Sequence, residues 1–186
     1  MAKAISRARQ MTVDQFFAWL EEGPEGARYE LVAGEVVAMA PERAAHAFLK
    51  ARIWRAFDDQ IGERGLPCQA LPDGMTVKID EHTAYEPDAA VHCGAPLDDE
   101  ALLVPEPVIL VEVLSPTTKA RDAGAKLADY FRLPSVRHYL LVRTEQRSVI
   151  HHRRGEDGAI ETRIVTSGVL PLDPPGLALD LGRIYR

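Results

Sequence analysis

Residues 108–114, Val-Ile-Leu-Val-Glu-Val-Leu, form an apolar run that contains one carboxylate, Glu112. The run has the length and composition of a buried strand, and the residues that follow it are typical of a helix. An unpaired carboxylate is costly in such a strand. Glu112 must therefore be protonated, paired with a base or bound to a cation, and the rest of the chain has to indicate which.

The other hydrophobic patterns place this strand in a mixed sheet. Thr12 and Gln15 have the spacing of a capping box before a short helix, and Ala33-Gly34 reads as a hairpin turn. A long helix with apolar residues at 49, 53, 54, 57 and 61 follows, and another helix is expected from about Thr118 to Leu133. Short strands are expected at CQAL, MTVKI, PDAAVHC and RHYLLV. This order predicts one α/β (α+β) domain over residues 11–186, after a flexible tail at 1–10.

The formal net charge of −6 limits the kinds of partner. Tight non-specific binding to nucleic acid depends on many basic residues, so the charge argues against a dedicated binder of that kind. An enzyme that holds its substrate through a metal ion and a local basic patch is not excluded. Residues 137–155 are the one strongly basic stretch, and we expect a solvated hairpin there because charge runs usually face water.

The cysteines and the N-terminus bear on the compartment. Cys68 and Cys93 match no metal-ligand spacing and suggest no disulfide framework, so two buried thiols in a reducing compartment are expected. The first residues lack the apolar stretch of a secretory signal, and no segment approaches transmembrane length. These features predict a cytoplasmic protein without a membrane segment.

Asp88 and Glu112 are the first candidates for chemistry. Each is expected on a short strand, and two such strands that pair side by side can bring both carboxylates to one point. Hard divalent cations such as Mg²⁺ are commonly held by one or two carboxylates plus waters. Alternatives stay open, because Asp after Pro is often only a turn former and Glu112 could point outward from an edge strand.

These residues carry a family resemblance. Pro87-Asp88, followed after a gap by Glu112-Val113-Leu114, resembles the core of the PD-(D/E)XK nucleases. The wider series of YELVAGEVVAM, a helix-opening His46, EPDAAV, VEVLSPTT and RHYLLV resembles the Uma-two family of restriction-endonuclease-like proteins. The resemblance covers about residues 11–182, and its specificity lies in the order and spacing of the motifs. It implies a central mixed sheet flanked by helices, a site dependent on Mg²⁺ or Mn²⁺, and DNA as substrate.

The resemblance also implies roles for individual residues. Asp88 and Glu112 would be metal ligands, with the Val113 carbonyl as a third. Glu30 matches an early acidic residue of such sites, and a water-facing glutamate in a hairpin is the alternative. His46 matches a histidine at a helix start that could touch phosphate or Glu30, and packing is the alternative.

The expected strand lysine is absent, because Leu114 stands two residues beyond Glu112. The resemblance places that lysine in the next helix, at Lys126, whose flexible stem can deliver an ammonium from another element. The alternative for Lys126 is a weak surface pair with Asp122. Lys119 is the other lysine of the segment, and we expect it to affect substrate affinity only.

The predicted activity is metal-assisted endonuclease hydrolysis of DNA phosphodiester bonds, with Asp88, Glu112, Lys126 and Glu30 in the catalytic group. A catalytically idle nucleic-acid-binding or interaction module on the same fold is the main alternative. A third reading is an enzyme that acts on a small acidic or phosphorylated metabolite. A homodimer is expected by analogy with nucleases that cut both strands of a duplex.

Overall fold

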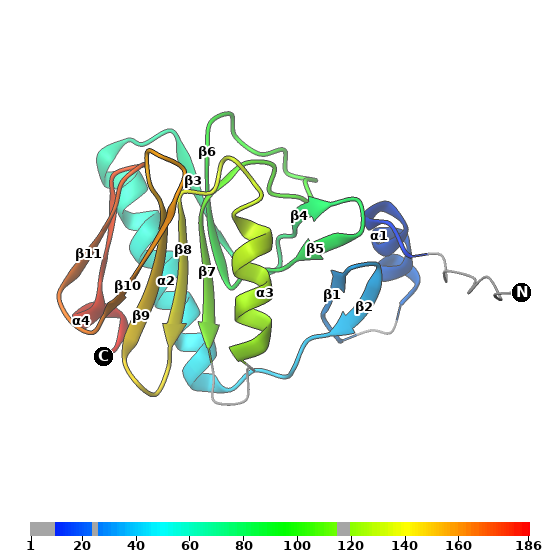
Figure 1. Ribbon diagram of the computed structural model, residues 1–186, viewed down its shortest axis with the longest axis horizontal. Helices are drawn as coiled ribbons and strands as arrows, with labels where there is room; N and C mark the ends of the chain where they lie inside the picture. The colour runs from blue at the N-terminus through cyan, green and yellow to red at the C-terminus, as the bar shows by residue number, and fades with distance from the viewer. Residues whose placement is uncertain (1–9, 24–25, 115–119) are drawn as a thin grey trace, which may run out of the picture.

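The computed structural model describes residues 10–23, 26–114 and 120–186, with only the backbone described for 120–123. Along the described chain, helices separate groups of consecutive strands (Figure 1). They run in the order α1 (Val13–Glu22), β1 (Tyr29–Val32), β2 (Glu35–Ala38), α2 (Ala44–Arg64), β3 (Cys68–Pro72), β4 (Val77–Asp80), β5 (Thr83–Tyr85), β6 (Ala89–Cys93), β7 (Pro107–Leu114), α3 (Ala120–Tyr130), β8 (His138–Arg143), β9 (Ser148–Arg154), β10 (Ile160–Val165), β11 (Val169–Leu172), β12 (Leu177–Asp180) and α4 (Leu181–Ile184).

A six-stranded sheet in the order β10-β9-β8-β7-β6-β3 forms the centre. β7 and β8 are parallel, and the other neighbours are antiparallel. A parallel pair needs a crossover connection, and α3 supplies it on one face of the sheet while α2 covers the opposite face (Figure 1). The expected α/β (α+β) fold, a central mixed sheet flanked by helices, is confirmed.

Strand β7 serves both faces of this sheet because its side chains alternate. Ile109, Val111 and Val113 belong to the core that includes α2. Leu110 belongs to the opposite core, which includes α3. Since Glu112 is two residues from Leu110, it projects toward the α3 face, where a buried strand delivers a carboxylate.

A second, four-stranded sheet in the order β2-β1-β5-β4 packs with α1. The predicted capping box is confirmed, because Thr12 accepts from the Gln15 backbone and the Gln15 side chain accepts from Thr12. The predicted hairpin is also confirmed, and both Ala33 and Gly34 have positive φ, at 50° and 82°. This sheet brings β1, which carries Glu30, toward the end of the central sheet.

The expectation of two free thiols is wrong. Cys68 and Cys93 lie directly opposite each other on the antiparallel strands β3 and β6 and form a disulfide. Their separation of 25 residues gave no indication of this pairing, which is created by the strand register. The inference of a reducing compartment, which rested on free thiols, loses that support.

The expectation that the hairpin at 137–155 is exposed to solvent is also wrong. The segment is a hairpin, but β8 is a central strand and its residues 138–142 are buried. The apolar residues at the centre of the segment drive this burial, while arginine guanidinium groups at its ends form hydrogen bonds. Arg154, for example, donates to the backbone carbonyls of Phe131, Leu133 and Val136.

The helix expected from about Thr118 to Leu133 is observed as α3, Ala120–Tyr130. Lys119 and the side chain of Asp122 lie outside the described residues, so the predictions about them are not addressed. None of the helices in the described ranges combines the length and the apolar character needed to cross a membrane.

Candidate active site

Glu112 lies at the end of β7 and is held from α3. The Lys126 ammonium donates a hydrogen bond of 2.9 Å to Glu112 Oε1. The Tyr130 hydroxyl, one helical turn later, donates to the same oxygen at 2.9 Å. Tyr130 itself is fully buried, so its ring packs in the core while its hydroxyl orients Glu112.

Glu30 joins this group from β1. Its Oε1 accepts from Lys126 Nζ at 2.7 Å and from the Glu86 backbone N–H at 2.9 Å. The Lys126 ammonium therefore bridges two carboxylates that are distant in sequence. The water-facing alternative for Glu30 does not hold, because only 11% of its side chain is exposed.

Asp88 lies in a bend one residue before β6. Its backbone N–H donates to the Val111 carbonyl at 2.9 Å. Its side-chain Oδ2 accepts from the Val113 N–H at 2.6 Å and lies 3.1 Å from His46 Nε2, on α2. The Asp88 carboxylate thus accepts the Val113 N–H where β6 begins, as a backbone carbonyl of a paired strand would, and it lies beside Glu112 and Val113.

The Val113 carbonyl points toward β6, the strand that Asp88 precedes. Within a strand, the N–H and C=O of one residue point to the same side and alternate at successive residues. Since the Val113 N–H reaches Asp88, the Val113 carbonyl is directed to the β6 side as well. The predicted ligand atoms of Asp88, Glu112 and Val113 therefore come from neighbouring positions at one end of the sheet.

The pKa of Glu112 lies well above its ordinary value. Burial raises the pKa of Glu112 to about 7; the Lys126 ammonium opposes this rise, and the negative charges of Asp88 and Glu30 add to it. Burial alone would lower the pKa of Lys126, but the charges of Glu112 and Glu30 outweigh burial and raise it. Lys126 is therefore a permanent cation, and it leaves the negative charge around it only partly balanced.

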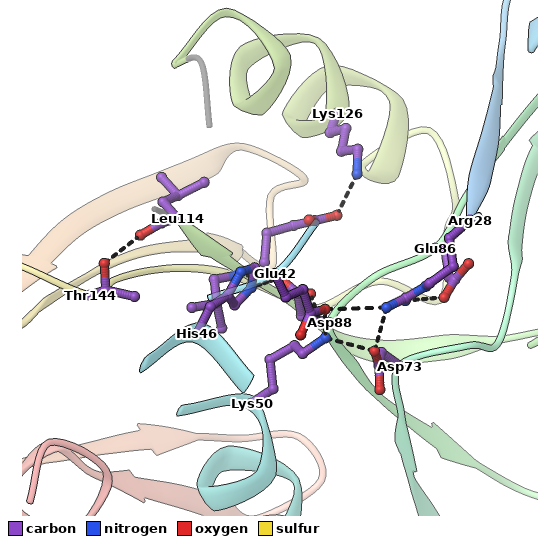
Figure 2. Close-up of polar contacts among 12 residues, drawn as sticks. Arg28, Glu42, His46, Lys50, Asp73, Glu86, Asp88, Leu114, Lys126 and Thr144 are labelled. Carbon is purple, nitrogen blue, oxygen red and sulfur yellow. Dashed lines mark hydrogen bonds and ion pairs between the residues drawn. The ribbon is translucent and has the colours of Figure 1, made fainter. Parts of the chain in front are cut away.

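A second charged group, which the sequence interpretation missed, adjoins Asp88 from the α2 side (Figure 2). Lys50, one helical turn after His46, lies between three acids: it donates to Glu42 and, at 2.6 Å, to Asp73, and lies 3.6 Å from Asp88. Arg28 donates to the same Glu42 and Asp73 oxygens and to Glu86. A signal for Lys50 was present, because it shares the buried stripe of α2 with Leu49, Ile53 and Phe57.

The oxygen donors fit a hard divalent cation bound partly by water. Mg²⁺ is commonly held by one or two carboxylates with waters completing its shell. Asp88 and Glu112 supply two carboxylates, and the Val113 carbonyl faces the same edge. A cage made of protein side chains alone does not fit, since within residues 10–23, 26–114 and 120–186 no three His, Cys, Asp or Glu side chains are grouped to hold a metal ion.

The predicted site residues thus fall into two contacting sets. Glu30, Glu112 and Lys126 form one ion-paired set, and Asp88 with His46 forms the other. Lys126 is engaged by these buried acids, and His46 touches Asp88 rather than Glu30. The catalytic and metal-binding role of each residue stays a prediction.

Comparison with known proteins gives consistent matches over most of the chain. The structure resembles that of a protein from Anabaena variabilis described as "a putative nuclease belonging to DUF820", with a TM-score of 0.75, 14% identity, and coverage of 94% of this chain and 97% of the other. At that identity the likeness concerns the fold.

Two sequence relatives come from Synechocystis sp., and both are named "Uncharacterized protein". One is 26% identical over 179 residues, which is 95% of this chain and 92% of the relative. The other is 25% identical over 156 residues, which is 82% of this chain and 86% of the relative. The family model Uma2, described as "Putative restriction endonuclease", matches residues 13–182. The chain therefore belongs to the Uma-two family of restriction-endonuclease-like proteins.

Proposed function

We propose that this protein is a Mg²⁺- or Mn²⁺-dependent endonuclease that hydrolyses phosphodiester bonds in DNA. The observation that carries the proposal is the Glu112 carboxylate at the end of a buried strand, next to Asp88 and Glu30, with the Lys126 ammonium bridging Glu30 and Glu112. Such a group of acids suits a divalent cation, which would offset the burial and the neighbouring negative charges that raise the pKa of Glu112.

Asp88 and Glu112 would hold the cation, with the Val113 carbonyl as a further donor. When bound, the cation polarises the scissile phosphate and lowers the pKa of a bound water. The Val113 N–H and His46 orient Asp88 by binding its Oδ2, and Tyr130 orients Glu112. Fixed ligand orientation matters because small displacements cost large factors in rate.

Lys126 would act on the reacting groups directly. It stays protonated, so it donates hydrogen bonds and does not serve as a base. In this position it orients the attacking water or stabilises the negative charge that develops on the phosphate. Glu30 holds the other side of the ammonium and fixes its direction.

The reach of Lys126 favours an enzyme over an idle binding module, because a lysine from α3 contacts the predicted metal ligand Glu112. His46, on α2, would contact a DNA phosphate next to Asp88. By analogy with enzymes that cut both strands of a duplex, we propose a homodimer with one site in each subunit.

A cleavage assay tests the proposal. Single-stranded, duplex and branched DNA would be incubated with the protein and Mg²⁺ or Mn²⁺. Asp88→Ala and Lys126→Ala should abolish cleavage, whereas Lys78→Ala, at an exposed lysine on β4, should leave it unchanged. Binding of DNA without cleavage by the wild-type protein would instead support the idle module, and cleavage that survives Asp88→Ala would refute the assigned site.

A further inference from the structure

The second charged group centres on a buried lysine. Lys50 is 6% exposed, although lysine is rarely buried unless it is paired. Its ammonium donates hydrogen bonds to Glu42 and, at 2.6 Å, to Asp73. Lys50 is therefore held by acids that belong neither to the predicted metal ligands nor to the predicted catalytic group.

The contact of Lys50 with Asp88 is of a different kind. Nζ lies 3.6 Å from Asp88 Oδ1, inside the range of an ion pair but longer than a hydrogen bond between nitrogen and oxygen. The other oxygen, Oδ2, is already oriented by the Val113 N–H and His46. The ammonium thus faces Asp88 Oδ1 without a hydrogen bond to it.

Arg28 fixes the two acids that hold Lys50. It donates to Asp73 Oδ2 at 2.6 Å and to Glu42 Oε1 at 3.2 Å, the same oxygens that accept from Lys50 (Figure 2). It also donates to Glu86, two residues before Asp88. Glu42 and Asp73 therefore cannot simply follow the Lys50 ammonium if it moves toward Asp88.

We propose that Glu42 and Asp73 hold the Lys50 ammonium away from Asp88, so that Asp88 Oδ1 remains available to a divalent cation. Lys50 is then a positioning residue that sets the affinity of the site for the cation. The inference rests on the proposed function, because it concerns a cation held by Asp88 and Glu112. If the hold on Lys50 were weakened, its ammonium would approach Asp88 and compete with the cation for Oδ1.

Single substitutions would change cation affinity in opposite directions. Asp73→Asn removes one of the charges that hold Lys50, so Mn²⁺ should bind about tenfold more weakly, which corresponds to about 1.4 kcal/mol. Lys50→Met removes the competitor, so Mn²⁺ should bind more tightly than it does to the wild-type protein. Simple addition or removal of nearby charge predicts the same signs, and a further comparison is needed to separate the two explanations.

The double variant Lys50→Met/Asp73→Asn makes that separation. If Asp73 acts by holding Lys50, Asp73→Asn should have little effect on Mn²⁺ affinity once Lys50 is absent, so the two effects are strongly non-additive. If both residues act only through their charge, the effects should add. Titration calorimetry with Mn²⁺ measures all four proteins without DNA or turnover, and circular dichroism checks that each is folded.

Lys50→Gln replaces Lys50→Met in the cycle if the methionine variant does not fold. Non-additive effects support the inference, and additive effects overturn it while leaving the metal site intact. Absence of Mn²⁺ binding to the wild-type protein would refute the proposed site itself. The two failures are therefore distinguishable in one set of titrations.

Discussion

The ion pairs of Lys126 allow a quantitative prediction for the variant Lys126→Met. Lys126 Nζ lies 2.7 Å from Glu30 and 2.9 Å from Glu112, and the three side chains are only 12%, 11% and 15% exposed. Methionine keeps most of the length and apolar stem of lysine but removes the charge. The variant leaves two largely buried carboxylates facing each other without the cation that bridges them.

The loss of stability follows from the cost of breaking a buried pair. Removal of one partner typically costs about 3–5 kcal/mol, because the remaining charge is left uncompensated. We expect the free energy of unfolding to fall by about 3 kcal/mol at pH 8, since the groups retain some solvent contact. For a chain of this length, that corresponds to a melting temperature lower by roughly 6–12 °C.

The loss should also depend on pH. Glu112 has its pKa raised to about 7 in the folded protein, above the ordinary value of 4.5, so ionisation of Glu112 makes folding less favourable as pH rises through this range. Lys126 opposes that rise, and its removal moves the pKa of Glu112 further upward. The stability difference between wild-type protein and Lys126→Met should therefore be small at pH 5 and grow toward pH 8.

Thermal and urea unfolding at pH 5 and pH 8, in the absence of divalent metal, measure this difference. Lys78→Met is the matched control, because Lys78 is exposed on β4, and it should change stability by less than about 0.5 kcal/mol at either pH. A loss below 1 kcal/mol at pH 8 for Lys126→Met, or a loss that is equal at the two pH values, would refute this account of the ion-paired set.

Three other predictions concern parts of the molecule outside this set. Burial lowers the pKa of His138 to about 4 and that of His151 to about 3, so both side chains are neutral in the folded protein. Each histidine should therefore lower the free energy of unfolding by about 2 kcal/mol between pH 7.5 and pH 5, because only the unfolded state gains the proton. Urea unfolding should show a shallower pH dependence of stability for His138→Gln, and an unchanged pH dependence would contradict the assignment. Alkylation without reductant should find Cys68 and Cys93 unreactive in the unfolded chain, and reduction should lower stability by about 3 kcal/mol for a loop of 25 residues, whereas two reactive thiols would refute the disulfide. Light scattering should give the mass of a dimer, and a monomer at working concentration would overturn the proposed homodimer.

The sequence predicted the elements with strong local patterns. The run at 107–114, the capping box at Thr12 and the helical stripe of α2 each carry a period or a terminal signal that needs no tertiary context. β5 was not foreseen, because Thr83–Tyr85 is too short to carry a period and depends on its neighbours β1 and β4. Burial of β8 was missed because flanking arginines and histidines hide its apolar centre.

Of the candidate site, only the residues that belong to sequence motifs in a recognisable order could be predicted. Asp88 and Glu112 could be selected from the residues around them, whereas Lys126 could be selected only through the family resemblance, and the structure places Lys126 in contact with Glu112. Arg28 could not be selected, because its partners Glu42, Asp73 and Glu86 come from three separate segments. The buried stripe of α2 indicated that Lys50 is buried, but it did not indicate the acids that hold it. The disulfide was missed for the same reason: Cys68 and Cys93 meet through strand register, which no local pattern encodes.

The most direct test of the central claim, that Asp88 and Glu112 hold a divalent cation, is the melting temperature measured as Mg²⁺ or Mn²⁺ is added. A ligand that binds only the folded state stabilises it by about 2.7 kcal/mol at 100 times its dissociation constant, which is roughly 5–11 °C for a chain of this length. We predict such a rise for the wild-type protein and none for Asp88→Ala. No rise in the folded wild-type protein at millimolar metal, or an equal rise in Asp88→Ala, would contradict the claim.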